Sequence, residues 1–184
     1  MGVCGEENRN IRKSTTNLKN IEEKIVNINK NKISLSFETI NKALSIHNNY
    51  RKNHGCNSLS LNDTLCDLAR EYAKKCANTK NIGYCDDLYN NDIIGQNIAV
   101  VNHHYFDVIE ICYEWYNEKK NYKFGSNKYI EGTGHFTQLI WKNTKYIGFG
   151  YEEDDNGNIY FVANYYPAGN IFNEFGENVP IAYR

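Results

Sequence analysis

The stretch GTGHFTQLIWKNT, residues 132–144, carries the most informative pattern in the chain. It places His135 beside glycines, which let the backbone approach closely and leave the ring accessible. A second short stretch, WYNE at residues 115–118, supplies the carboxylate of Glu118. A glutamate and a histidine that meet across a cleft serve as general acid and base, as part of a metal site, or as a buried structural hydrogen bond. The two stretches alone leave these three interpretations open and favour the structural hydrogen bond.

Apolar residues recur at helical spacing in the first half of the chain. A first helix is predicted from Ser36, a suitable N-cap, to Gly55, a suitable stop, with His47 on its inner stripe as a hydrogen-bonded core residue. A second helix is predicted to open at Asn62 or Asp63. Its predicted inner stripe, from which Cys66 is absent, consists of Leu65, Leu68, Ala69, Tyr72, Ala73 and Cys76.

A third helix is predicted over roughly residues 105–119, before the period changes. Its predicted inner face consists of Val108, Ile109, Cys112, Trp115 and Tyr116. Residues 146–151 and 159–165 are then rich in β-branched and aromatic residues, and the Asn156-Gly157 pair between them favours a hairpin. A sheet this aromatic needs both faces covered, which predicts an α+β fold with helices on both sides of an antiparallel sheet.

Composition excludes several classes of partner. The 184 residues carry 21 Lys and Arg against 22 Asp and Glu, so there is no basic footprint for nucleic acid. No apolar run approaches the roughly 18 residues of a membrane span. Residues 1–35 are rich in Asn, Lys and Glu and are predicted to be a polar extension, with one domain over residues 36–184. We expect a monomer or a weak dimer.

The six cysteines do not define a compartment. An even number suits a disulfide framework, and six would allow 15 pairings, but a domain of this length does not need one. The start of the chain gives a second signal, since Gly2 and Cys4 resemble acylation sites for myristate and palmitate. Glu6 stands where serine or threonine is preferred, so a plain start to a secreted chain is the favoured alternative.

Residues 132–144, with four further motifs in order, resemble the signature of the CAP superfamily of cysteine-rich secretory, antigen 5 and pathogenesis-related proteins. The further motifs are HNNYR at 47–51, GQNI at 95–98, WYNE at 115–118 and YYPAGN at 165–170. The resemblance covers about residues 36–182 and implies a three-layer α-β-α sandwich with a central antiparallel sheet.

The resemblance also implies a central cavity lined by two histidines and two glutamates that often holds a divalent cation. Glu118 and His135 match two of these positions, whereas Gln96 replaces the other glutamate and the other histidine falls at or next to Cys85. His103 and His104 lie beyond the motif and do not restore that position. Because His135 would be the one strong ligand left, we expect no cofactor, and zinc is disfavoured unless Cys85 binds as a thiolate.

Two departures from the family concern disulfides. Many secreted members carry cysteines where this chain has Thr133 and Ala163. That resembles the Golgi-associated branch, which lacks these bridges and can be acylated. It also resembles the venom-allergen-like proteins of parasitic nematodes, whose AT-rich genomes would explain the many Asn and Lys residues.

The loop before His135 is aromatic, and the corresponding family region resembles a sterol-binding loop. Its aromatic residues are Tyr116, Tyr122, Phe124 and Tyr129. Rings with polar tips suit an amphipathic ligand, although the same rings could simply roof the core.

Together these features predict a non-enzymatic, secreted CAP-domain protein, an antigen or immunomodulator at a host–parasite interface. Its expected partners are a sterol, a fatty acid or a host protein. The alternatives are a cation-dependent hydrolase that uses Glu118 and His135, and an N-acylated adaptor on the cytoplasmic face of a membrane.

Overall fold

The computed structural model describes residues 37–83 and 88–183. Contacts divide the chain into two units, Met1–Thr39 and Ile40–Arg184. Apart from its first residues, the helix over residues 37–53 belongs to the second unit, as do all the elements below. The N-cap predicted at Ser36, the extension over residues 1–35 and the acylation sites lie outside the described residues. The domain boundary at residue 36 stays a prediction.

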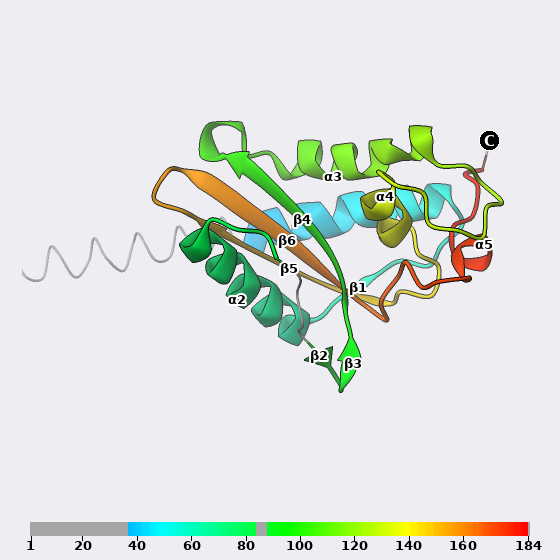
Figure 1. The fold of residues 1–184 in the computed structure, drawn as a ribbon, viewed down its shortest axis with the longest axis horizontal. Coiled ribbons are helices and arrows are strands. Elements are labelled where there is room, and N and C mark those ends of the chain that lie inside the picture. The colour runs from blue at the N-terminus through cyan, green and yellow to red at the C-terminus, as the bar shows by residue number, and fades with distance from the viewer. Residues whose placement is uncertain (1–36, 84–87, 184) are drawn as a thin grey trace, which may run out of the picture. The chain divides into compact units, whose positions relative to one another are not determined.

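A four-stranded sheet forms the middle layer, in the order β1-β5-β6-β4 (Figure 1). Its strands are β1 (Ser60–Leu61), β4 (Gly95–Asn102), β5 (Tyr146–Glu153) and β6 (Asn158–Tyr166). Pairing is antiparallel except between β1 and β5, which run parallel. The predicted hairpin is confirmed, and Gly157 adopts φ +77° in its turn, where a residue without Cβ avoids strain.

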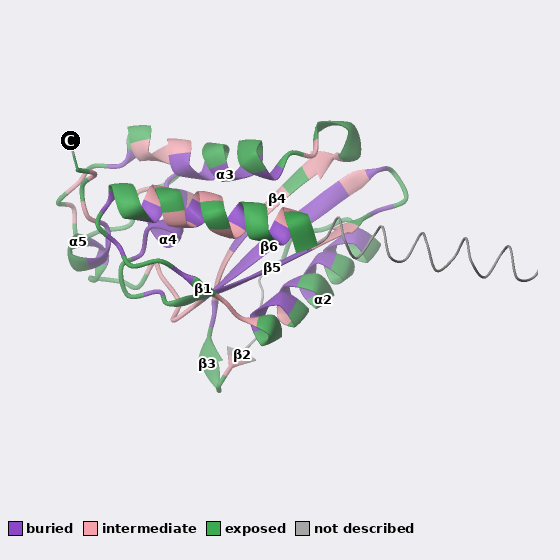
Figure 2. Ribbon diagram, turned by 180° about the vertical axis from the view of Figure 1, so that it is seen from behind, coloured by how far each residue is buried: buried purple, intermediate pink, exposed green. Residues whose placement is uncertain are grey.

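Helices cover both faces of the sheet, so the predicted three-layer arrangement is confirmed (Figure 1). One face packs against α2 (Asp63–Thr79), which Asn62 caps by accepting from the Leu65 amide. The other face packs against the helix over residues 37–53, α3 (Val108–Asn117) and α4 (Gly134–Leu139). The buried sides of these helices all turn toward the sheet (Figure 2). Across the described residues, no helix combines the length and apolarity of a membrane span.

Short elements join the layers. A small hairpin pairs β2 (Leu88–Tyr89) with β3 (Asp92–Ile93), and two 3-10 turns, η1 (His103–Tyr105) and η2 (Glu118–Asn121), flank α3. The last helix is α5 (Phe175–Asn178).

The predicted inner faces are wrong at four residues. On α2, Cys66 is buried and its sulfur accepts from the Phe149 amide, whereas Leu68 is half-buried. On α3, Ile111 is buried and Ile109 is 42% exposed. Asp107 caps α3 by accepting from the Ile109 amide, and the helix therefore starts later than predicted.

The buried Arg51 side chain fastens the first helix to the loop around α4. Its guanidinium donates to the carbonyl oxygens of Asn57, Leu139, Trp141 and Thr144 at 2.8–3.1 Å. Arginine carries five fixed donors and stays charged, so one side chain can satisfy several buried carbonyl groups at once.

Candidate functional site

Glu118 and His135 lie together at the junction of α3, η2 and α4. Glu118 is the first residue of η2, directly after α3, and His135 is the second residue of α4. The His135 Nδ1 lies 2.6 Å from the Glu118 Oε1, and the ring lies nearly parallel to the Trp115 ring at 5.8 Å between centroids. The two residues that match the family motifs are therefore in direct contact.

Both carboxylate oxygens of Glu118 are engaged. Oε1 accepts from the His135 ring, while Oε2 accepts from the backbone amides of His135 at 2.9 Å and Phe136 at 3.0 Å. Amides in the first turn of a helix have no partner within the helix, and a negative charge there complements the helix dipole. The N-cap residue of α4, Thr133, offers no side-chain bond to it. Glu118 therefore caps α4 from a distant point in the chain.

The hydrogen bond to Glu118 also orients the His135 imidazole. Because Nδ1 is committed to the carboxylate, Nε2 is the ring nitrogen that remains for an outside partner. The His135 side chain is 40% exposed and the Glu118 side chain 21% exposed. The pair thus presents one ring nitrogen toward solvent from a rigid, half-buried support.

Gln96 is directed elsewhere. Along β4, Ile98 packs with the cluster on α2, whereas Asn97 reaches the opposite face and donates to the His135 carbonyl oxygen at 3.0 Å. Gln96 precedes Asn97 on the strand, so its side chain points to the α2 face of the sheet. It donates to the Asn164 carboxamide oxygen at 2.9 Å, and Asn164 in turn donates to the Leu65 carbonyl oxygen of α2. The structure does not bring Gln96 into hydrogen-bond contact with Glu118 or His135, and Cys85 lies outside the described residues.

The described residues at this place do not fit a zinc ion. Structural and catalytic zinc sites take three or four nitrogen, sulfur or oxygen ligands from the protein. His135 offers one ring nitrogen, the oxygens of Glu118 are occupied in capping α4, and Gln96 is bonded to Asn164. Within residues 37–83 and 88–183, no three His, Cys, Asp or Glu side chains are grouped to hold a metal.

The aromatic loop is largely packed into the core. Tyr116 and Tyr122 are buried, and both pack against the Phe136 ring. Phe124 is half-buried between Phe136 and His54, whereas Tyr129 is 55% exposed. Two of the four rings thus form a wall, and the other two reach the surface.

A buried polar chain supports the site from below. The Tyr165 hydroxyl joins the His47 Nε2 at 2.9 Å to the Asn97 carboxamide at 3.1 Å, and the His47 Nδ1 meets the Ala43 carbonyl oxygen at 2.8 Å. Burial lowers the pKa of His47 to about 4, so the ring is neutral and joins the core as a hydrogen-bonded residue. The same Asn97 amide holds the His135 carbonyl group. Sequence reasoning missed Asn97 and Tyr165, although both stand inside the motifs.

Four cysteines of the described residues are buried and unpaired, namely Cys56, Cys66, Cys76 and Cys112. A framework that joins all six cysteines is therefore excluded. Burial raises the pKa of each thiol, for Cys112 to about 12, which keeps them protonated and unreactive. Thr133 and Ala163, where the family resemblance led us to look for cysteines, are buried.

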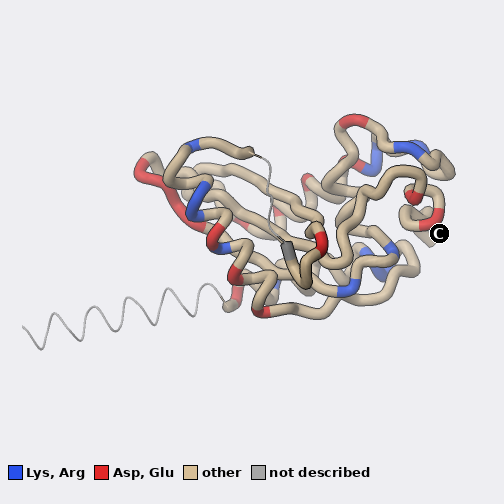
Figure 3. The backbone as a smooth tube through the Cα atoms, turned by 60° about the horizontal axis from the view of Figure 1, so that its bottom comes forward, with Lys and Arg blue, Asp and Glu red and all other residues tan. Residues whose placement is uncertain are grey.

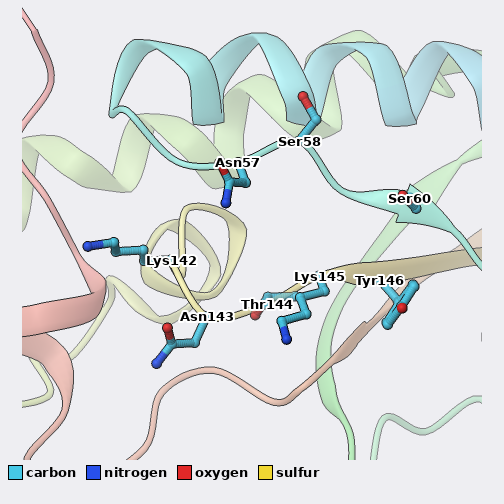
Figure 4. A pocket seen from close by; sticks show the side chains of 8 residues that line it. All are labelled: Asn57, Ser58, Ser60, Lys142, Asn143, Thr144, Lys145 and Tyr146. Atoms are coloured by element: carbon cyan, nitrogen blue, oxygen red, sulfur yellow. The ribbon is translucent and has the colours of Figure 1, made fainter.

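A separate pocket of about 300 Å³ lies between the loop after the first helix and the segment that leads into β5 (Figure 4). Its lining is polar and includes two cations but no carboxylate. The lining residues are Asn57, Ser58, Ser60, Lys142, Asn143, Thr144, Lys145 and Tyr146. Sequence reasoning assigned no role to this region beyond the family motif.

The fold and the Glu118–His135 junction define a class of protein, an α-β-α sandwich whose site is built where α3 meets α4. Residues 44–165 match the cysteine-rich secretory protein family, CAP. The match covers more than half of the chain, and the protein belongs to this family.

Relatives agree with this assignment. The chain is 37% identical over 148 residues to human Golgi-associated plant pathogenesis-related protein 1, covering 79% of this chain and 95% of that protein. It is 41% identical over 128 residues to venom allergen 5 of Vespa magnifica, covering 64% of this chain and 54% of the allergen. Among solved structures, venom allergen-like protein 4 of Schistosoma mansoni superposes with a TM-score of 0.59 at 25% identity, covering 80% of this chain and 96% of that chain.

Proposed function

We propose that this CAP protein acts by binding and has no catalytic activity. The observation that carries the proposal is the engagement of both Glu118 oxygens, which makes this carboxylate unavailable as a base beside His135. Among the described residues, no hydroxyl or thiol group is hydrogen-bonded to the His135 ring, so the usual nucleophile and base pair is not assembled.

The rival function is a cation-dependent hydrolase centred on Glu118 and His135. Zinc titration, followed by thermal melting and by turnover of ester and peptide substrates, tests it. We expect no zinc-dependent hydrolysis, and we expect H135A to behave as the wild type does. Hydrolysis that zinc stimulates and that H135A abolishes would overturn the non-catalytic proposal.

We propose an amphipathic lipid, a sterol or a fatty acid, as the ligand. Phe124 and Tyr129 support this proposal, because they reach the surface while Tyr116 and Tyr122 form a rigid wall behind them. An aromatic ring covers the apolar body of such a ligand, and a hydroxyl group meets its polar end.

A binding titration with cholesterol and with palmitate tests the lipid proposal. The variant that combines F124A and Y129A should lose saturable binding while keeping its fold, because neither side chain is fully buried. The matched control is Y146A, which removes a 40%-exposed tyrosine beside the polar pocket and should bind normally. Absence of saturable binding by the wild type would contradict the lipid proposal.

For location, we propose secretion and action at a host–parasite interface, as an antigen or immunomodulator that also contacts a host protein. The likeness to venom allergen 5 and to the Schistosoma mansoni protein supports this. Fractionation of the source organism and its culture medium is the test, and recovery of the protein only from the cells would contradict secretion.

A second candidate is an acylated adaptor at the cytoplasmic face of a membrane. Four buried, unpaired thiols favour it, because a reducing compartment preserves them, and so does the likeness to the Golgi-associated protein. Mass spectrometry of the native N-terminus discriminates, since acyl groups on Gly2 and Cys4 would replace the secretion proposal with this one.

A further inference from the structure

Two histidines and a glutamate meet at one end of the sheet, where β4 passes into η1 and the β5–β6 hairpin turns back (Figure 1). The Nε2 atoms of His103 and His104 lie 3.1 Å apart, and the His103 Nδ1 lies 2.8 Å from the Glu153 Oε1. The His103 side chain is 41% exposed, so this cluster is open to solvent. It shares no residue with the Glu118–His135 site.

The bond to Glu153 sets the tautomer of His103. In a neutral imidazole one nitrogen carries the proton and the other carries a lone pair. Because Nδ1 donates to the Glu153 carboxylate, Nε2 of His103 offers its lone pair toward the Nε2 of His104. A carboxylate that holds one ring nitrogen while the other faces a metal is the usual outer-shell arrangement of metal-binding histidines.

The His103 ring is held in place before any ion arrives. Its backbone amide donates to the Gly157 carbonyl oxygen at 2.8 Å, and the next amide, of His104, donates to the Asn102 side chain. A Cβ at Gly157 would lie 2.6 Å from the His103 Nδ1, so this glycine leaves the room that the ring occupies. The end of β5 and the turn that follows it therefore position one imidazole.

The surroundings favour a cation. Residues 152–155 are four consecutive acidic residues at the end of the hairpin, visible as a continuous red stretch (Figure 3). One of them, Asp155, pairs with Lys80 at 2.6 Å. The Glu153 carboxylate, in direct contact with the His103 ring, places negative charge at the cluster, and negative charge raises the local concentration of cations.

We propose that His103 and His104 form a two-nitrogen binding site for a divalent transition-metal ion of the zinc, nickel or copper class. Imidazole suits these ions, and two nitrogens at about 2.0–2.1 Å from one tetrahedral ion lie about 3.4 Å apart, close to the 3.1 Å between the two Nε2 atoms. The ion takes the place of the proton that lies between the two rings. That proton leaves the His104 Nε2 and is replaced, through solvent, by a proton on the His104 Nδ1. Water fills the remaining positions, because the described residues offer no group of three such ligands.

Calorimetric titration of the full chain with zinc chloride tests the site. The wild type should bind one ion saturably, and H103A and H104A should each lose that binding. E153Q, which keeps a hydrogen-bond acceptor but removes the charge, should weaken it by about 10–100-fold, as outer-shell substitutions do. H135A is the matched control and should bind as the wild type does.

Thermal melting without metal shows whether each variant is folded, and the exposed position of the His103 side chain predicts that H103A is folded. Absence of saturable zinc binding by the wild type would overturn the proposal. So would retention of binding by folded H103A or H104A, or loss of binding in H135A alone, since each result would place the ion elsewhere.

Discussion

The two faces of the sheet are packed by opposite means. Against α2 the strand β5 presents glycines, so backbone meets backbone, and a Cβ at Gly148 or Gly150 would lie within 2.2–2.3 Å of α2 backbone atoms. Against the other helices the sheet presents large rings, with Phe149 and Phe161 stacked at 5.8 Å between centroids. This second face, called the ring face below, also contains the polar chain through His47 and Tyr165.

This difference explains where the site is built. Where β5 meets α2 by direct backbone contact, there is no room for a larger side chain. On the opposite face the packed rings hold the polar side chains between them in fixed positions. One of these side chains, Asn97, donates to the His135 carbonyl oxygen and so holds the segment that carries His135. The α2 face therefore acts as the rigid support, and the ring face positions the chemistry.

The largest effect is expected on the α2 face. G148A forces a methyl group against the Leu65 carbonyl carbon, and we expect a loss of about 3 kcal/mol in the free energy of unfolding, measured by urea denaturation. G83A is the control, because a Cβ there meets nothing within 4 Å. Equal stability of the two variants would show that the α2 face tolerates added volume as the ring face does.

A pH dependence is expected from the ring face. Burial lowers the pKa of His47 from 6.5 to about 4. Between pH 4 and pH 6.5 the unfolded chain therefore binds a proton at this residue, whereas the folded chain does not. The contribution of His47 to the free energy of unfolding is fully present above pH 6.5. It falls by about 3 kcal/mol as the pH drops toward 4.

Urea denaturation across this pH range measures the slope. H47Q should flatten it, leaving the smaller contribution of His54, whose pKa burial also lowers. An unchanged slope in H47Q would mean that the ring face does not hold a neutral histidine.

A smaller effect is expected for Y165F, which removes one oxygen and keeps the ring. The His47 Nε2 and the Asn97 amide both lose a buried partner, and we expect a loss of about 2 kcal/mol in stability. F161L, in contrast, changes packing alone and should leave the His47 pKa near its present value. A neutral outcome for Y165F would indicate that the polar chain adds nothing to the ring face.

The smallest effect is expected for E118Q at the edge of the ring face. The amide keeps one acceptor oxygen for α4 but loses the charge that complements the helix dipole, so we expect a loss of about 1 kcal/mol. Thermal melting measures the change, and E114Q, on an exposed position of α3, is the control. A larger loss in E114Q would contradict the capping role of Glu118.

Much of the fold follows from local signals in the sequence. The Asn62 cap, the α2 spacing and the Asn156-Gly157 turn act over a few residues, and each predicted its element. The exact inner faces were less predictable, because apolar residues at neighbouring helical positions compete for the core and long-range packing decides between them. In α3 the other four predicted residues are buried, but Ile111 takes the place predicted for Ile109.

The candidate site was only partly predictable. Glu118 and His135 stand in motifs, and their contact agrees with the motif order. The use of Glu118 as a cap depends on where α4 begins, 16 residues later in the chain, and no local pattern encodes that. The direction of Gln96 depends on strand register, and a shift of one residue would turn it to the other face. The assignment of Cys85, Gln96, Glu118 and His135 to one cavity stays a prediction.

The capping bond from Glu118 to α4 also bears on how such proteins diverge. A residue that the fold needs is retained after its chemistry has become dispensable, whereas a residue that serves only a reaction is free to drift. In this chain Glu118 caps α4 whether or not the site carries out a reaction. The presence of the pair is therefore by itself a poor guide to activity.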